Sequence, residues 1–360
     1  MVELHAERDW AMRRFDYSFL YNGMLPAGLL NIATDIYSLR AMAWNRKDQF
    51  ADVFTELARV ARVQSIKSSN AIEGIITTDE RINEIVNGSS APLNHSEQEI
   101  AGYRDALAEV HTDYLNMDFR QADILRLHAT MMNIAGYSSA GKYKEVDNDI
   151  IEEDQDGRRR VRFHPTSAAD TPEAMEQLLL AYQEARDNPN INQLLLIPCV
   201  ILDFLCIHPF RDGNGRISRL LSLLLLYKNG FDAGKYISFE EQINKRNGNY
   251  YDALKQSSAG WHEGENDYSA FILEFLITLY SCYKELDKRF AVLGNRKVTK
   301  QARIEATVMN SLTPISKSDI CKILPDVSAT TVESVLGKMV REGQLRKVGT
   351  GRCTRYVRSK

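Results

Sequence analysis

Apolar side chains recur every three or four positions along much of this chain, which is the spacing of one face of an α-helix. The pattern is clearest in four segments, residues 50–66, 101–114, 122–132 and 268–290. The spacing therefore predicts a mostly α protein, in which each of these segments turns an apolar face toward a core.

One stretch departs from the helical spacing. Residues 146–151 and 158–163 are two short β-prone segments, and the four residues between them, 154–157, are typical of a turn. Gly157 can adopt a positive φ there at little cost. We therefore expect one hairpin, over residues 146–163, that projects from the helices.

Length, charge and cysteine content narrow the class of protein. A chain of 360 residues predicts two or three folding units. Its net charge of -3 gives no general attraction to nucleic acid or to anionic membranes, so any basic surface has to be local. The five cysteines contain no CxxC pair, so neither disulfide bonds nor a structural zinc site is expected.

The sequence carries no sign of a membrane segment. The N-terminus lacks the pattern of a signal peptide. The two most apolar runs, residues 194–207 and 220–226, are too short to span a bilayer. These features predict a cytoplasmic protein that does not contact a membrane.

Residues 208–219 form the polar segment with the strongest chemical signal. They read His-Pro-Phe-Arg-Asp-Gly-Asn-Gly-Arg-Ile-Ser-Arg and join two apolar segments, so they predict a loop between two helices. Backbone N–H groups at the start of the second helix attract anions, and Gly213 and Gly215 allow a phosphate group to approach the backbone closely. The segment therefore predicts a phosphate-binding loop.

The side chains of this loop supply the other groups that phosphate-ester chemistry needs. His208 is a base that works near neutral pH, and Asp212 is an oxygen ligand suited to Mg²⁺. Arg216 and Arg219 can hold phosphate groups. The pattern GxxxxGK[ST] is absent and the glycines do not continue into GxGxxG, which excludes a P-loop and a dinucleotide-binding fold.

The same residues match a known family signature. Residues 208–219 agree at every specified position with HPFx(D/E)GNGRxxR, and on this match the chain is identified as a member of the Fic family. The resemblance covers about residues 50–290 and is strongest over the signature itself. It implies a protein adenylyltransferase that uses ATP and Mg²⁺ to move AMP onto a hydroxyl side chain of a target protein or of itself.

The resemblance also implies a role for each residue of the loop. His208 takes the proton from the target hydroxyl, and Asp212 binds Mg²⁺ between the α- and β-phosphates. Phe210 anchors the loop in the core. The remaining residues hold ATP phosphates. The backbone of Gly213, Asn214 and Gly215 forms an anion hole, and Arg216 and Arg219 bind phosphates through their side chains. A subgroup of the family with Lys in place of the second glycine transfers the terminal phosphate, so Gly215 favours nucleotide transfer.

A second motif resembles the inhibitory helix of many Fic proteins. Ser69, Glu73 and Gly74 fit the pattern (S/T)xxxE(G/N) at the end of a predicted helix that begins near Phe50. By resemblance, Glu73 pairs with Arg219, withdraws it from the γ-phosphate and leaves ATP in an unproductive pose. Ser69 helps to hold the helix against the core. The sequence therefore predicts an enzyme that is restrained by its own N-terminal region.

Two further segments resemble parts of a Fic substrate site. The hairpin 146–163 corresponds to the flap that receives the target segment by strand addition, which places a Ser, Thr or Tyr side chain over His208. Tyr250 and Tyr251 correspond to the segment that lines the pocket for the nucleotide base and ribose. Since adjacent helical residues point in different directions, we expect one of these tyrosines in the core and Tyr251 at the ligand.

The last region of the chain has a different composition. Three short helical segments and two β-prone segments follow one another in the order of a winged helix, and the last 32 residues contain eight Lys or Arg against two Glu. The alternatives for residues 300–360 are contact with DNA, contact with another protein, and pairing of two copies of the chain.

These patterns predict three parts and leave three functions open. The parts are an N-terminal helical region with the inhibitory motif (1–110), a Fic catalytic core (111–294) and a winged-helix domain (295–360). The first function is protein adenylyl transfer restrained by Glu73. The second is a DNA-binding regulator that uses the Fic core as a nucleotide sensor. The third is a Fic enzyme with another donor, or one whose main activity is removal of AMP.

Overall fold

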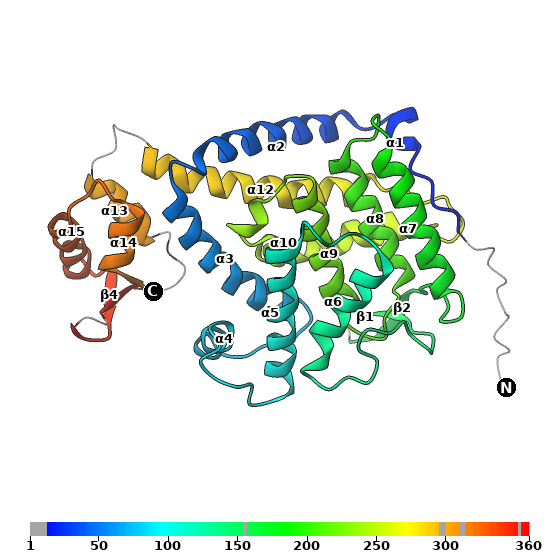
Figure 1. The fold of residues 1–360 in the computed structure, drawn as a ribbon, viewed down its shortest axis with the longest axis horizontal. Helices are drawn as coiled ribbons and strands as arrows, with labels where there is room; N and C mark the ends of the chain where they lie inside the picture. Colours follow the sequence, from blue (N-terminus) through cyan, green and yellow to red (C-terminus); the bar gives the residue numbers. More distant parts are fainter. Residues whose placement is uncertain are drawn as a thin grey trace. The chain divides into compact units, whose positions relative to one another are not determined.

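The computed structural model describes residues 13–153, 157–294, 300–309, 311, 314–351 and 354–359. The chain is mostly α-helical, as predicted (Figure 1). It forms two compact units. The first contains Met1–Ala33, Ser65–Asp232 and Glu240–Thr278, and the second contains Thr34–Gln64, Ala233–Phe239 and Leu279–Lys360. None of the helices in the described part of the chain has both the length and the apolar character needed to cross a bilayer.

The first unit is built around two consecutive apolar helices, α8 (Gln193–Ile207) and α9 (Asn214–Lys228). Every residue of α8 after the first is buried, and so is nearly all of α9. A helix without a solvent-facing side can be apolar all round, which explains the two most apolar runs of the sequence. The helices packed against this pair are α5 (His95–Asp113), α6 (Gln121–Asn133) and α7 (Thr171–Asp187).

The remaining helices complete the two units. The short helices are α1 (Phe19–Asn22), α4 (Asp79–Val86), η1 (Ala233–Lys235), α10 (Phe239–Lys245) and α11 (Asn247–Ser258). Three long helices contribute residues to both units: α2 (Ala27–Arg46), α3 (Ala51–Ile72) and α12 (Ser269–Gly294). The four helical segments predicted from the apolar spacing lie in α3, α5, α6 and α12, to within one residue at their ends, which confirms them.

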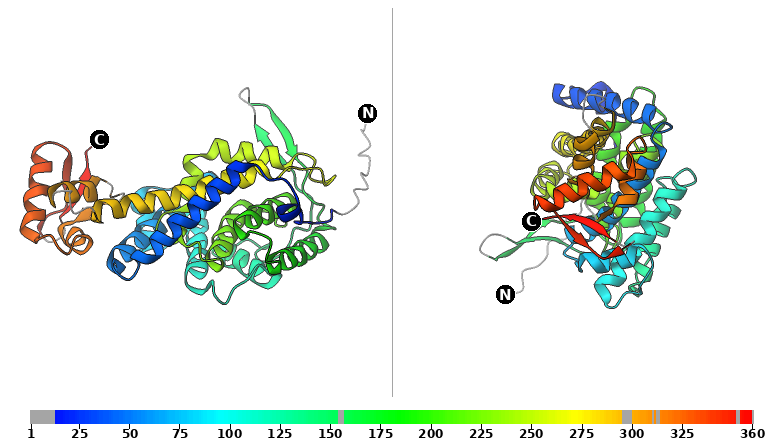
Figure 2. Two further views of the ribbon diagram at one scale, coloured as in Figure 1. Left: turned by 90° about the horizontal axis from the view of Figure 1, so that it is seen from above. Right: turned by 90° about the vertical axis from the view of Figure 1, so that its left-hand side faces the viewer.

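The predicted hairpin is present and projects from the helices of the first unit (Figure 2). It consists of β1 (Ile150–Glu153) paired antiparallel with β2 (Arg159–Phe163), and Gly157 has φ 77°. The other predicted turn residues, 154–156, lie outside the described residues. The first strand begins at Ile150 rather than at residue 146. Asp147 instead accepts a hydrogen bond from the Ala168 N–H, so short polar side chains compete here with strand pairing.

The segment before α1 is fastened to α8 by a buried carboxylate. Asp203 of α8 accepts hydrogen bonds from the Tyr17 hydroxyl (2.7 Å), the Trp261 indole Nε1 (2.7 Å) and the Tyr268 hydroxyl (3.0 Å). Burial raises the pKa of Asp203, and the nearby Arg13 guanidinium, 3.9 Å away, opposes this rise. The N-terminal segment is therefore an integral part of the first unit.

The end of the chain has a core of its own. It comprises α13 (Lys300–Met309), β3 (Ile315–Ser316), α14 (Lys317–Ile323), α15 (Ala329–Arg341), β4 (Leu345–Val348) and β5 (Arg355–Arg358). We call these elements the C-terminal module. The three strands form one sheet in the order β3-β5-β4, and a cluster of buried residues between Ile304 and Tyr356 joins it to the helices. The expected helices and strands are thus present, whereas the predicted domain boundary falls on residues 295–299, outside the described residues.

The cysteines agree with the expectation that disulfide bonds are absent from the described part of the chain. Cys199, Cys206 and Cys282 are buried and Cys321 is half-buried, and none of these four is in a disulfide bond, while Cys353 lies outside the described residues.

The Asp203 cluster gives a test of how much the N-terminal segment contributes to stability. Tyr17→Phe should lower the free energy of unfolding by about 1.5–3 kcal/mol, because it removes a buried hydrogen bond to an ionisable group and leaves Asp203 with fewer donors. Tyr21→Phe, at a half-exposed tyrosine of α1, should change it by less than about 0.5 kcal/mol. Urea denaturation measures both values, and equal values for the two variants would contradict this account of the cluster.

Candidate functional site

The loop between α8 and α9 has an unusual backbone at both ends. His208 ends α8 in the left-handed conformation (φ 53°) and is the one residue other than glycine with a positive φ in the described part of the chain. Such a conformation is costly for a residue with a side chain and is typical of functional sites. Gly213 (φ 79°) precedes the first turn of α9. The N–H groups of that turn have no acceptor within the helix, and they make an anion-binding position.

The middle of the loop is held by Asn214 and Phe210. The Asn214 side chain accepts a hydrogen bond from the Phe210 N–H (2.9 Å) and donates one to the Phe210 carbonyl oxygen (2.7 Å). The Phe210 ring is fully buried, as expected of a core anchor, and stacks on His128 of α6 with 3.8 Å between ring centroids and 7° between planes. The loop therefore has one well-defined conformation.

His128 ties the loop to the segment that leads to the hairpin. Its Nδ1 accepts a hydrogen bond from the Gly141 N–H (2.9 Å), so the ring proton is on Nε2, which donates to the Asp212 carbonyl oxygen (3.2 Å). Burial lowers the pKa of His128 to about 4, which keeps the ring neutral at pH 7. His128 therefore fixes the position of Asp212 through hydrogen bonds and that of Phe210 through stacking.

Lys144 supports the first part of the loop from the other side. Its N–H donates to the Pro209 carbonyl oxygen (2.9 Å), and its Nζ donates to the Ile207 carbonyl oxygen (3.3 Å) and to the Asn148 side chain (2.9 Å). Burial lowers the pKa of Lys144 to about 8. The peptide groups on both sides of His208 are thus held by one buried lysine.

The His208 imidazole has the form that a general base requires. Its Nδ1 lies 3.3 Å from the Leu205 carbonyl oxygen, which can only accept, so Nδ1 carries the proton and Nε2 keeps its lone pair. The pKa of His208 is lowered to about 4, mainly by burial; the positive charges of Lys144 and Arg162 act in the same direction, and the Leu205 carbonyl and the Glu73 carboxylate oppose them. At neutral pH Nε2 can therefore accept a proton.

Asp212 and Arg216 lie close together at the start of α9. The Asp212 carboxylate is half-exposed, accepts a hydrogen bond from the Gly213 N–H (2.6 Å) and lies 3.8 Å from Arg216 Nη2. The side chain of Arg216, a residue predicted to hold phosphates, is 1% exposed and pairs with Glu99 of α5 at 2.7 Å. Arg216 thus supports the start of α9 from inside the protein.

The donors at this place suit Mg²⁺ bound together with phosphates. Magnesium in proteins commonly takes one or two carboxylates, and phosphate oxygens and waters fill the other positions. No group of three or more His, Cys, Asp or Glu side chains is arranged to hold a metal within the described ranges. Asp212, accessible and next to the anion-binding turn, is therefore the residue that fits such an ion.

Arg219 is brought together with the residues of the second motif. It is buried on α9, and its Nε donates to the Ser69 hydroxyl (2.8 Å) while its Nη2 donates to the Ser69 carbonyl oxygen (2.9 Å). The same Nη2 forms an ion pair with Glu73 Oε1 at 2.8 Å. The contacts expected of Ser69 and Glu73 with Arg219 are therefore present.

The Glu73 carboxylate also lies against the backbone of the loop. A Cβ atom placed on Gly215 would collide with Glu73 Oε1 and would lie 3.4 Å from Arg219 Nη1. A carboxylate oxygen thus occupies the space in front of the first turn of α9, where the N–H groups attract an anion. Gly74 follows with φ 76° and turns the chain away from α3.

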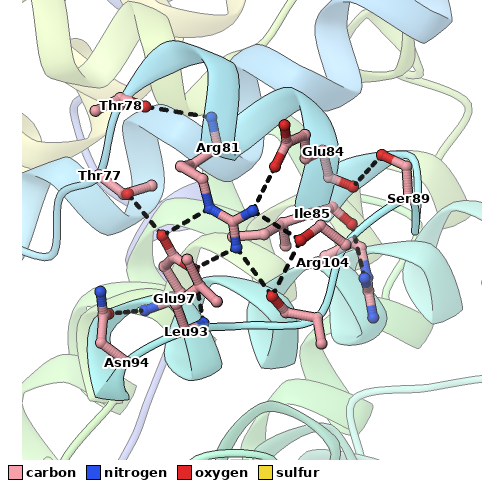
Figure 3. A network of polar contacts seen from close by, with 12 residues as sticks. Thr77, Thr78, Arg81, Glu84, Ile85, Ser89, Leu93, Asn94, Glu97 and Arg104 are labelled. Carbon is pink, nitrogen blue, oxygen red and sulfur yellow. Dashed lines mark hydrogen bonds and ion pairs between the residues drawn. The ribbon is translucent and has the colours of Figure 1, made fainter.

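The chain after Gly74 is fastened to α5 (Figure 3). Glu97 of α5 accepts hydrogen bonds from Arg81 (3.1 and 2.7 Å), from the Thr77 hydroxyl (3.0 Å) and from the Leu93 N–H (2.8 Å). These contacts, with Arg81 first, lower the pKa of Glu97 to about 2. The end of α3 and Glu73, which follows it, are therefore held in a fixed position relative to α5 and to the loop.

The two tyrosines of α11 point in different directions. Tyr250 is buried and packs edge-on against Phe271 at 5.5 Å, whereas Tyr251 is 39% exposed. Burial raises the pKa of Tyr251, and the charges of Glu73, Arg219 and Arg162 all act on it. Tyr251 therefore lies near the charged residues of the loop, and Tyr250 belongs to the core.

Comparison with known proteins identifies the family. The model of the Fic/DOC family matches residues 118–226. A Fido domain-containing protein of Dictyostelium discoideum is 30% identical over 118 residues, which are 32% of this chain and 78% of that protein. The protein adenylyltransferase Fic of Nematostella vectensis is 26% identical over 208 residues, which are 56% of this chain and 44% of that protein. The chain belongs to the Fic/DOC family.

Solved structures share the fold. A Fic family protein from Desulfovibrio desulfuricans has a TM-score of 0.62 at 21% identity, over 93% of this chain and 97% of its own. Fic-1 from C. elegans has a TM-score of 0.54 at 17% identity, over 73% of this chain and 74% of the solved chain. At such identities the likeness concerns the fold.

Several residues of the site were not identified from the sequence. His128, Lys144 and Glu99 lie 63 to 117 positions before the residues they contact, within otherwise ordinary helical or loop segments. A lone histidine or lysine gives no sign of its partner, since only the tertiary fold brings them together. For His128 and Glu99 the one available signal was their polarity at positions where the helical spacing calls for a buried residue.

His128 gives a test of the support beneath the loop. His128→Phe keeps an aromatic ring beside Phe210 but leaves the Gly141 N–H and the Asp212 carbonyl without their partners. The free energy of unfolding should fall by about 2–4 kcal/mol, as expected for two buried polar groups that lose a hydrogen bond. His164→Phe, at an exposed histidine after the hairpin, should leave it within about 0.5 kcal/mol in urea denaturation. A His128→Phe protein as stable as the wild type would show that these bonds do not hold the loop.

Proposed function

We propose that this protein transfers AMP from ATP to a hydroxyl side chain of a target protein or of itself, and that Glu73 restrains the reaction. The observation that carries the proposal is the Glu73 carboxylate against Gly215 and Arg219. An anionic group already lies where the first turn of α9 and a buried guanidinium favour negative charge. An ATP phosphate group suits the same position.

In the proposed reaction the chain positions groups and stabilises charge. The hydroxyl oxygen attacks the α-phosphorus, the bond from that phosphorus to the bridging oxygen breaks, and pyrophosphate leaves with the electron pair. The hydroxyl proton passes to Nε2 of His208, which is the unprotonated nitrogen. Asp212 would hold Mg²⁺, which when bound would neutralise charge on the phosphates. Backbone N–H groups of residues 213–215 bind phosphate oxygens, as the exposed first turn of α9 allows.

Nucleotide transfer is favoured over transfer of the terminal phosphate by the residue at position 215. While Glu73 is in place, its carboxylate fills the space beside Gly215, so the restrained state leaves no room there for a longer side chain. This agrees with the expectation, by resemblance, that Gly215 favours nucleotide transfer. Tyr251 on α11 offers an exposed aromatic face for the adenine base.

The proposed restraint is an exchange of partners at Arg219. The guanidinium needs an acceptor because it is buried, and Ser69 and Glu73 now fulfil this need. The Glu73 side chain is 32% exposed, so it can leave toward solvent and let Arg219 bind a phosphate instead. ATP bound while Glu73 remains in place has its terminal phosphate displaced from Arg219.

The target segment is proposed to add to the hairpin. Ile151 and Val161 are exposed apolar residues on β1 and β2, and they offer contacts for side chains of an extended peptide. Main-chain pairing places a hydroxyl near His208 with little dependence on the target sequence, so a segment of this chain can also serve. A Fic enzyme with another nucleotide donor, or one that removes AMP, uses the same groups of the site. The mass of the adduct that is gained or lost distinguishes these reactions.

Removal of the restraint should increase automodification. Glu73→Gly should raise incorporation of labelled AMP from ATP and Mg²⁺ by at least about tenfold, since a partly buried charge pair that competes with the phosphate is lost. Intact-mass analysis should show an adduct of about 329 Da, one AMP less water. Glu263→Gly, at an exposed loop glutamate, should behave as wild type.

His208 provides the control for chemistry in the same experiment. Glu73→Gly combined with His208→Ala should lose at least about 100-fold in labelling, the usual contribution of a general base. Unchanged labelling in Glu73→Gly would remove the restraint from the proposal. Labelling that persists without His208 would remove the proposed mechanism.

The C-terminal module supports a second candidate function. We infer that it is a winged helix that binds duplex DNA. Helices α14 and α15 are joined by the short turn 324–328, and the two-stranded ribbon β4–β5 follows, an arrangement that can place a helix in the major groove. The exposed side chains of α15, β4 and β5 include Lys338, Arg341, Arg346, Lys347, Arg355 and Arg358. This local basic surface belongs to a chain whose net charge is -3.

Salt dependence tests the DNA contact. The full chain should bind a DNA duplex with an affinity that falls steeply as the salt concentration rises. When Arg346→Glu and Lys347→Glu are combined, the slope of log K against the logarithm of the salt concentration should become less steep by about two. Lys284→Glu with Lys288→Glu, an equal charge change at two exposed lysines of α12, should leave the slope unchanged. Fluorescence anisotropy measures it. Absence of binding, together with a changed oligomeric state in the first variant, would assign the surface to protein contact.

A further inference from the structure

Arg162 occupies an irregular position on the hairpin. Ile150 pairs with Phe163 and Ile151 pairs with Val161, so Arg162 is the extra residue of a β-bulge. A bulge turns the side chain of its extra residue away from the regular alternation of the strand, and bulges are frequent next to active sites. The preceding residues of β2, Arg159, Arg160 and Val161, are exposed, whereas Arg162 is half-buried. The bulge therefore directs this one arginine inward.

The Arg162 guanidinium is only partly satisfied by the protein. Its Nη1 is shielded from solvent and has no hydrogen-bond partner among the described residues. Burial lowers the pKa of Arg162, although the group remains a cation at neutral pH. A buried cationic N–H without an acceptor is costly and is seldom kept without a use.

The nearest carboxylate is already engaged elsewhere. Glu152 of β1 accepts hydrogen bonds from Lys255 of α11 (3.1 and 2.9 Å) and also pairs with Arg160. These contacts fix the hairpin to α11 and leave Arg162 without that carboxylate as a direct partner. The charge of Arg162 acts instead on the imidazole of His208, on the Tyr251 hydroxyl and on the buried Cys206 thiol. Since Glu152 contacts Lys255, one helical turn after Tyr251, the hairpin lies against the part of α11 that carries this tyrosine. Arg162 is therefore placed near Tyr251 and close enough to His208 to act on its imidazole.

We propose that Arg162 is an anion-binding residue of this site and that it holds the phosphate group next to His208, the one that is transferred. The inference rests on the proposed function, in which the α-phosphate lies between the ribose, near Tyr251, and the attacking hydroxyl, near His208. The guanidinium donates to the non-bridging oxygens of that phosphate. It stabilises the negative charge that they gain while the bond to the hydroxyl oxygen forms and the bond to pyrophosphate breaks.

This position divides the phosphates between two arginines. Arg219 lies on α9, where Glu73 competes for it, and the proposal gives it the distal phosphates. Arg162 lies on the hairpin, to which the target segment is proposed to bind. In the proposal, Arg162 binds the α-phosphate. Docking of the target strand and alignment of the reacting phosphate are then linked through one bulge.

The experiment compares ligands with and without a phosphate. Isothermal titration of the full chain with adenosine and with AMP is carried out for wild type, Arg162→Gln, Arg162→Lys and Arg159→Gln. Arg162→Gln should weaken AMP binding by about 10- to 100-fold, the usual effect of losing a hydrogen bond to a charged group, and leave adenosine binding unchanged. Arg162→Lys should restore part of the loss, and Arg159→Gln, on the exposed part of the same strand, should bind both ligands as wild type does.

The outcomes separate this inference from the proposed function. Unchanged adenosine binding also reports that the variant is folded. Equal AMP binding by wild type and Arg162→Gln would overturn the role of Arg162 while leaving the proposed function intact. A variant that changes only the KM for an acidic target peptide would also overturn this role of Arg162 and leave the proposed function intact, because Arg162 would then bind the target and not the α-phosphate. If wild type binds neither adenosine nor AMP, the proposed function fails as well.

Discussion

The buried guanidinium of Arg219 is the constraint on which the proposed regulation depends. A cation removed from water requires an acceptor, and the first turn of α9 beside it favours negative charge for the same reason. Ser69 and Glu73 now provide the acceptors at 2.8–2.9 Å. Because Glu73 Oε1 also lies against Gly215, one carboxylate is next to both the arginine and the first turn of the helix. A phosphate group could do the same, so the two anions compete for one place.

The rest of the first unit makes this competition possible by holding both sides in place. On one side, His128, Asn214 and Lys144 give the loop a single conformation. On the other side, Arg81 and Glu97 fasten the chain that follows Gly74 to α5 (Figure 3). In the proposed restraint, rotation of the Glu73 side chain is enough to change the state of the site. The proposal therefore needs no rearrangement of the helices, and a modest change in free energy can shift the equilibrium.

The sequence allowed the prediction of the parts of the site that lie close together in the chain. Residues 208–219 form one continuous segment, a loop followed by the first turns of α9, so their spacing alone was sufficient to predict a helix–loop–helix anion site. The pairing of Glu73 with Arg219 followed from family resemblance. The structure adds a partner that the sequence did not predict for Arg216. This residue, predicted to hold phosphates, is buried against Glu99, more than a hundred positions earlier in the chain. Neither Arg216 nor Glu99 carries a local signal of that pairing.

The fold was predictable to a similar extent. The long helices followed from apolar spacing, since burial of one face dictates a period near 3.6 residues. The hairpin was predicted, but its first strand begins four residues later because Asp147 and Asn148 bind loop groups rather than a neighbouring strand. The bulge at Arg162 had no signature in the sequence, since a bulge is defined by the register of two strands and not by the residues of one.

The central claim is that Glu73 and the terminal phosphate of ATP compete for Arg219. The most direct measurement is a pair of crystal structures with ATP and Mg²⁺, one of wild type and one of Glu73→Gly. The account predicts phosphates at the N–H groups of residues 213–215 in both, with Arg219 on Glu73 in the wild type and on the γ-phosphate in the variant. A nucleotide bound away from this loop, or an Arg219 that contacts the γ-phosphate equally in both structures, would contradict it.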